Sequence, residues 1–306
     1  MKLSQTNGAL WKYCDNVYDT LAILKRAGFQ YVDLSFWSRF TPGSDYFTRD
    51  LDEIAAEYRD ALDKLGLVPV QSHEPFGNSM GDDGGRFYFK KTPRSIELAG
   101  KIGVPSITLH AGINIVPMSR DEYLTKSADI FRQLIPYAEK YGIKLLLENI
   151  AWTVDGVHLA SADNMLELLE RLDNHPLFGI CWDAGHANLC GLDQYENIKK
   201  MGDKLLGVHL HDNFGPKAGM DMHTFPHWGN INYDALITAL LEIGYKGTFN
   251  FEVDAPGARS GAIPFEKDGV SQEKLALLPA EVREQSETML YNIGKKMLEA
   301  YDCFEI

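Results

Sequence analysis

The sequence lacks the features that mark membrane proteins and disulfide-rich secreted proteins. No apolar run in its 306 residues approaches the length of a transmembrane helix, and the first residues, MKLSQTN, contain no apolar signal-peptide core. The cysteines are few and scattered, with neither a CxxC pair nor zinc-ribbon spacing: Cys14, Cys181, Cys190 and Cys303. We therefore predict a reduced, cytoplasmic protein that does not engage a membrane.

Positive charge is also scarce. Lys and Arg number 30 against 43 Asp and Glu, which gives a formal net charge of -13. No cluster of Lys and Arg is longer than a pair such as Lys90 and Lys91, and this balance gives no counterion-release affinity for a phosphate backbone. We expect no nucleic-acid partner.

Short apolar strands and amphipathic helices alternate along the whole chain. We predict eight strand–helix units, with strands at about 2–6, 31–37, 67–73, 106–110, 143–149, 178–183, 205–211 and 248–253. The helix at 50–65 starts at Asp50 and stops at Gly66, Thr92 and Pro93 open another helix, and one long helix runs from Ser119 to Tyr141. No composition break marks a linker.

Such alternation implies a parallel sheet, and eight units in this length fit a closed barrel. We predict an α/β fold: a single (β/α)8 TIM barrel over residues 1–306, with its active site at the C-terminal face and a helix at about 280–300 packing on the barrel. A doubly wound open sheet is the competitor. It would not bring the strand ends around one axis, and no GxGxxG motif follows the first strand.

Six of the predicted strands end in a side chain that can bind a metal ion: His73, His110, Glu148, Asp183, His209 and Glu252. Ends of neighbouring parallel strands converge at the barrel mouth. Three carboxylates meeting in a pocket of low dielectric would be costly without a cation. Three oxygen ligands and one imidazole suit Mn2+, Mg2+, Co2+ or Zn2+, so Glu148, Asp183, His209 and Glu252 are the predicted metal ligands.

A second group of candidate ligands lies beside the first. His186 follows Asp183 by three residues, and Asp221 and His223 alternate in an irregular segment, so their side chains point the same way. These three residues hold a second ion, bridged by Asp183, or hydrogen-bond a polyol substrate. We predict that Gly185 allows a sharp turn. His211 lies past its strand end, and we predict that it either supports the ligands from behind or has a structural role.

The strand-end motifs are LLLEN (145–149), WDAGH (182–186), VHLHDN (208–213), DMH with the following GNI (221–231) and FNFEV (249–253). Together they resemble the xylose isomerase-like barrel superfamily, which includes sugar isomerases, ketohexose 3-epimerases, hydroxypyruvate isomerases, inosose dehydratases and endonuclease IV. The resemblance implies that Glu148, Asp183, His209 and Glu252 hold one divalent metal. It also implies that Glu148 and Glu252 act as acid and base, with metal-bound substrate oxygens stabilising an enediolate.

The same resemblance leaves other chemistries open. Nine positions match a trinuclear zinc set of endonuclease IV: His73, His110, Glu148, Asp183, His186, His209, Asp221, His223 and Glu252. An endonuclease needs phosphate-neutralising side chains at its mouth, however, and the loops after these strands are acidic or apolar. Aromatic residues past the strand ends suit stacking on sugar rings, and the predicted substrate-binding residues are His73, His110, Trp37, Trp152 and Lys217.

We therefore predict a divalent-metal-dependent sugar or sugar-phosphate isomerase or epimerase with a small-molecule sugar substrate. The alternatives are an endonuclease IV-like multi-zinc phosphodiesterase and an inosose-type dehydratase. One or two metal ions and a homodimer are further expectations.

Overall fold

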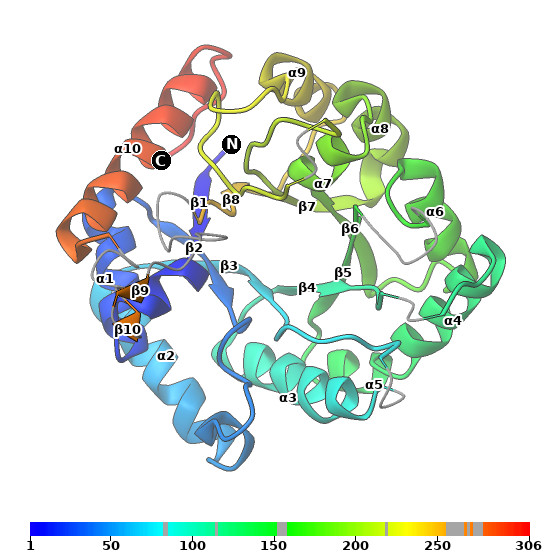
Figure 1. The fold of residues 1–306 in the computed structure, drawn as a ribbon, viewed down its shortest axis with the longest axis horizontal. Coiled ribbons are helices and arrows are strands. Elements are labelled where there is room, and N and C mark those ends of the chain that lie inside the picture. The colour runs from blue at the N-terminus through cyan, green and yellow to red at the C-terminus, as the bar shows by residue number, and fades with distance from the viewer. Residues whose placement is uncertain are drawn as a thin grey trace.

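Eight parallel strands form a barrel at the centre of the molecule, ringed by helices (Figure 1). The computed structural model describes residues 1–81, 85–113, 116–151, 158–217, 220–254, 266–267, 270–271 and 278–306. The strands are β1 (Leu3–Thr6), β2 (Tyr31–Ser35), β3 (Val68–His73), β4 (Ser106–His110), β5 (Lys144–Glu148), β6 (Phe178–Asp183), β7 (Leu205–His209) and β8 (Phe249–Phe251). Their order, β7-β6-β5-β4-β3-β2-β1-β8, follows the chain around the barrel.

The barrel closes between β7 and β8. The backbone N–H of Leu210 donates to the carbonyl of Asn250 over 2.9 Å, and that of Glu252 donates to the carbonyl of Leu210 over 3.0 Å. These bonds remove the last open edge, so all eight carboxyl ends surround one axis. The predicted (β/α)8 barrel is confirmed.

The helices between the strands are α1 (Val17–Ala27), α2 (Leu51–Leu65), α3 (Arg86–Ile102), α4 (Arg120–Arg132), α5 (Ile135–Glu139), α6 (Ala162–Arg171), α7 (Ala184–Leu189), α8 (Gln194–Met201), α9 (Tyr233–Glu242) and α10 (Ala280–Glu299). The 3-10 helices are η1 (Gly8–Lys12), η2 (Asp45–Phe47) and η3 (Gly202–Lys204), and β9 (Glu266–Lys267) pairs with β10 (Val270–Ser271). Within the described segments, no helix has both the length and the apolarity needed to cross a bilayer.

Local sequence signals explain most helix boundaries. The Asp50 side chain accepts the backbone N–H of Asp52 at the start of α2, and Gly66 ends that helix in the left-handed conformation. Ser119 and Glu122 form a reciprocal capping box at the start of α4. The apolar faces that follow these caps pack onto the outside of the barrel.

Two helix predictions were wrong. Thr92 and Pro93 do not open a helix: α3 starts at Arg86, and the Thr92 hydroxyl donates to the buried carboxylate of Glu74 over 3.0 Å instead of capping. The predicted helix from Ser119 to Tyr141 is two helices, because α4 ends at Arg132 and α5 begins just before Pro136, whose ring cannot continue the backbone hydrogen bonding.

A polar layer lies inside the barrel below the strand ends. The carboxylate of Asp33, in the middle of β2, accepts hydrogen bonds from Gln71 on β3 over 2.9 Å and from Asn250 on β8 over 3.0 Å. All three side chains are buried. Buried polar groups are stable only when paired, so this layer fixes the relative positions of three strands beneath the mouth.

Candidate metal centre and active site

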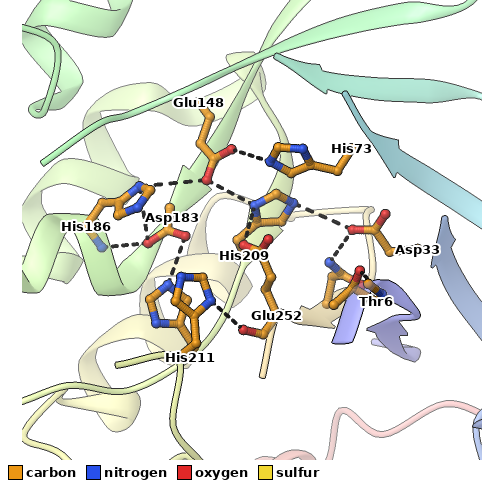
Figure 2. Close-up of polar contacts among 12 residues, drawn as sticks. Thr6, Asp33, His73, Glu148, Asp183, His186, His209, His211 and Glu252 are labelled. Carbon is orange, nitrogen blue, oxygen red and sulfur yellow. Dashed lines mark hydrogen bonds and ion pairs between the residues drawn. The ribbon is translucent and has the colours of Figure 1, made fainter. Parts of the chain in front are cut away.

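The four predicted metal ligands meet at the C-terminal ends of β5, β6, β7 and β8. One ligand atom from each of Glu148, Asp183, His209 and Glu252 can be chosen so that all four lie within 4.8 Å of one another. Figure 2 shows these side chains pointing toward a common centre. The Nδ1 atom of His209 is 3.0 Å from Oε1 of Glu148 and 3.1 Å from Oε2 of Glu252.

Two further histidines reach Glu148 from β3 and β4. The Nε2 atom of His110 lies 2.8 Å, and that of His73 3.4 Å, from Oε2 of Glu148. The Nδ1 atom of His73 is 2.8 Å from the carbonyl of Glu74, so Nδ1 carries a proton and donates to that carbonyl, and Nε2 faces Glu148.

The second predicted group lies next to the first. The Oδ2 atom of Asp221 is 2.9 Å from Nε2 of His223 and 3.3 Å from Nε2 of His186. The Nδ1 atoms of these two histidines lie 2.9 Å from the carbonyl of Glu252 and 2.8 Å from that of Asn149. The backbone that follows the first group therefore orients the imidazoles of the second.

His211 lies in this second group, where sequence analysis expected it to support the ligands from behind or to have a structural role. With Asp221 and His223 it forms a set of ligand atoms within 4.8 Å, and its ring stacks on that of His223 with centroids 3.8 Å apart. Its Nε2 atom is also 3.1 Å from Oδ2 of Asp183. Asp183 thus contacts both groups, and its role as a carboxylate that bridges two ions stays a prediction.

Asp33 is a second residue that sequence reasoning missed. Its Oδ2 atom lies 3.6 Å from Nε2 of His209, on the far side of the ring from Glu148 (Figure 2). A charged residue inside the apolar stretch YVDLS was the available signal, because an unpaired carboxylate is rarely buried within a strand.

Gly185 does not provide a sharp turn. It lies inside α7, which starts directly after β6 and uses the Asp183 carboxylate to accept the backbone N–H of His186 over 2.6 Å. A Cβ on Gly185 would lie 1.9 Å from the His211 ring, so close packing requires the glycine.

Burial and neighbouring charges shift the pKa values of the side chains in the centre in opposite directions. Burial raises the pKa of Glu148, but the imidazoles of His110 and His209 hold it well below its usual range. Burial lowers the pKa of His73, but hydrogen bonding and attraction to Glu148 raise it to about 9. Burial likewise lowers the pKa of His223, and Asp221 raises it to about 10. Glu148 is therefore charged at neutral pH.

The donor set fits divalent metal ions. Although His110 Nε2 and Glu148 Oε2 are only 2.8 Å apart, their geometry is not that of a hydrogen bond, and both atoms are buried without a hydrogen-bonding partner in the described structure. The Nδ1 atom of His211 and Oδ1 of Asp221 are also buried without a hydrogen-bonding partner in the described structure. Buried lone pairs facing one another are satisfied by a shared cation.

Accessibility distinguishes two layers of side chains. The side chains of Glu148, Asp183 and His209 are completely buried, whereas that of Glu252 is 21% exposed. His110, Asp221 and His223 are also partly exposed. A molecule entering the mouth therefore meets Glu252 and His110 before Glu148.

The remaining predicted substrate-binding residues differ in outcome. The Trp37 ring packs edge-on against His73 and His110, with centroids 5.4 and 5.9 Å apart. Lys217 is exposed after β7 and makes no hydrogen bond or ion pair with described residues. Trp152 lies outside the described residues.

A cavity of about 770 Å³ lies away from the mouth between α9 and α10, lined by apolar residues such as Ile237, Met289 and Met297.

Comparisons with known proteins identify the family to which this chain belongs. A family model described as "Xylose isomerase-like TIM barrel" matches residues 21–280. A 2-oxo-tetronate isomerase of Haemophilus influenzae is 28% identical over 249 residues, covering 78% of this chain and 88% of that protein. The match to an uncharacterised protein of Sinorhizobium fredii, 29% identical, spans 51% of this chain and only half the length of that relative.

Solved structures show the same fold. A D-tagatose 3-epimerase-like protein superposes with a TM-score of 0.73 at 21% identity, covering 99% of this chain and 98% of the other.

Proposed function

The chain belongs to the xylose isomerase-like TIM barrel family, and we propose that it is a divalent-metal-dependent sugar or sugar-phosphate isomerase or epimerase. The observation that carries the proposal is the convergence of Glu148 and Glu252 on one atom, Nδ1 of His209, at 3.0 and 3.1 Å. Two carboxylates at one point are what a proton transfer from and back to carbon requires. The relative named 2-oxo-tetronate isomerase supports this reaction class.

The reaction is a proton shuttle at the carbon next to a carbonyl group. One carboxylate removes the proton, and the electron pair of the C–H bond forms a C=C bond while the carbonyl electrons move to oxygen. For epimerisation, the second carboxyl group gives the same carbon a proton that it has taken up from water. For isomerisation, the proton of the neighbouring hydroxyl group moves to the former carbonyl oxygen, and a carboxyl group protonates the former carbonyl carbon. Glu252, the more accessible carboxylate, meets the substrate at the mouth, and Glu148 acts from beneath.

The metal ligands would be Glu148, Asp183, His209 and Glu252. A divalent ion held there supplies positive charge beside the substrate oxygens, which acidifies the neighbouring C–H group. His110 and His73 are placed to hydrogen-bond a substrate hydroxyl group, since both lie on the side of Glu148 that faces Trp37.

An activity screen tests the proposal. We expect the Mn2+-loaded protein to convert at least one member of a panel of free and phosphorylated aldoses and ketoses, and chelator-treated protein to convert none until Mn2+ or Co2+ is returned. Turnover that is indifferent to chelation would contradict the metal requirement.

A multi-zinc phosphodiesterase is the second candidate, favoured by one observation. The ligand atoms fall into three sets rather than one. The sets His73–Glu148–His209 and Glu148–Asp183–His209–Glu252 share two residues, and His211–Asp221–His223 is separate from both. The net charge of -13 opposes binding of a polyanionic substrate. Cleavage of an abasic-site oligonucleotide by zinc-loaded protein at low salt would favour this candidate.

Location and assembly remain parts of the proposal. All four cysteines are free thiols, in keeping with a reduced cytoplasmic protein. A homodimer remains a prediction.

A further inference from the structure

An aromatic surface leads outward from the candidate metal centre. The Trp37 ring contacts the imidazoles of His73 and His110 on its inner side. On its outer side it meets Phe76, with ring centroids 4.6 Å apart and planes inclined by 47°. The two rings form one continuous apolar platform that begins at side chains around Glu148 and ends in solvent.

The backbone holds this platform in place. The N–H of Phe36 donates to the carbonyl of His73 over 3.0 Å, and the N–H of Phe76 donates to the carbonyl of Trp37 over 3.3 Å. These bonds extend the pairing of β2 and β3 past the ends of both strands. The platform is therefore preorganised, which lowers the entropy cost of binding a ligand on it.

The platform is exposed to an extent that packing does not explain. Trp37 is 41% and Phe76 60% exposed, although the residue before each of them, Phe36 and Pro75, is buried. Exposed adjoining aromatic rings next to a polar centre are a common form of ligand-binding surface. A single sugar ring facing His110 and Glu252 would reach Trp37 but leave Phe76 uncovered, because Phe76 lies one ring further out.

We propose that the substrate is a sugar that keeps its carbonyl group free and carries a second ring on one of its other hydroxyl groups. The second ring stacks on Trp37 and Phe76 while the sugar that reacts faces Glu252. This inference rests on the proposed isomerase or epimerase function and names the substrate class of that same site. Stacking requires only a flat apolar face, which a second sugar ring and an aryl group both present. Binding energy gained on the platform would orient the reacting carbon between the carboxylates.

The test compares monosaccharides with their ring-extended forms. A panel of free aldoses and ketoses, the same sugars with a phenyl ether on a hydroxyl group away from the carbonyl, and reducing disaccharides that contain them is titrated calorimetrically into Mn2+-loaded protein. Turnover is measured in parallel. We expect the ring-extended forms to bind about tenfold more tightly, the size of one aromatic contact. The arm that gains more affinity, phenyl ethers or reducing disaccharides, identifies the second ring.

Phe76→Ala should remove this advantage and leave monosaccharide binding unchanged, and Phe76→Tyr should restore it. Tyr137→Ala is the matched control, because Tyr137 is 42% exposed on α5. Equal affinity for both forms, or an equal loss for both in Phe76→Ala, overturns the inference while the proposed function stands. If no sugar in any form binds or reacts, the proposed function itself fails. Binding of a single-stranded oligonucleotide that is lost in Phe76→Ala would assign the platform to nucleobases instead.

Discussion

A Cβ atom on Gly185 would lie 1.9 Å from Cε1 of His211. This contact couples the first turn of α7 to the histidine that joins Asp183 to the second ligand group. Since α7 begins at the end of β6, the helix backbone itself forms one wall of the centre. The glycine in WDAGH is required by packing rather than by backbone conformation.

We expect Gly185→Ala to displace the His211 ring and to disrupt the second ligand group. Overpacking at a buried position costs about 1–3 kcal/mol of unfolding free energy. Metal content measured by mass spectrometry should fall, with the loss confined to the second group. Gly103→Ala is the control, because it strains a residue with φ of +94° but meets no atom within 4 Å. Equal metal content in both variants would contradict the coupling.

His223→Ala separates the two ligand groups more directly. It removes one ligand of the second group and leaves Glu148, His209 and Glu252 in place. If the second group holds its own ion, metal content should fall by one equivalent while the first ion is retained. A loss of all metal would mean that the two groups bind as one unit, and no loss would assign His223 to the substrate.

Asp33→Asn tests whether a carboxylate below the centre orients His209. Asp33 accepts from Gln71 and Asn250 and faces the His209 ring, as outer carboxylates do at metal-bound histidines. We expect metal affinity to fall about 10–100-fold, the range for such partners. Calorimetric titration of Zn2+ into the chelator-treated protein measures it. Unchanged affinity would leave Asp33 a purely structural member of the polar layer.

The metal-free protein should lose stability as pH rises. The folded pKa of His73 is about 9, above the value of about 6.5 for an unfolded chain. The protonated His73–Glu148 pair therefore contributes fully to stability below about pH 6.5, and this contribution is lost as pH rises through about 9. In chelator, the Tm of the wild type should fall more between pH 6.5 and 9.5 than that of His73→Gln. Parallel curves would contradict the pairing.

The barrel and its ligand ring could be predicted because both follow from local pattern. Each short apolar run that ends in a candidate ligand predicts a buried strand with that ligand at its carboxyl end. Closure of the sheet then brings those ends together. The exact agreement at β4, where the predicted strand 106–110 is the observed Ser106–His110, reflects a strand buried along nearly its whole length.

The residues that were missed depend on contacts distant in sequence. His211 joins the second group because the chain after β7 folds back, with Asp212 pairing with Thr224, so that Asp221 returns to the barrel mouth. The burial of the Asp33 carboxylate is explained by its partners Gln71 on β3, His209 on β7 and Asn250 on β8, all distant in sequence. Pro93 stands inside α3 because Thr92 is needed by Glu74, a contact across the helix–strand interface that no local pattern records.

Transfer of solvent deuterium tests the central claim most directly. The Mn2+-loaded protein is incubated in D2O with each sugar of the screen, and the products are analysed by NMR. We predict deuterium at one carbon, next to the carbonyl group, and a decrease of roughly 10²–10⁴-fold in its rate of appearance in Glu252→Gln and in Glu148→Gln. Conversion without deuterium, or undiminished exchange in both variants, would contradict proton transfer by this pair of carboxylates.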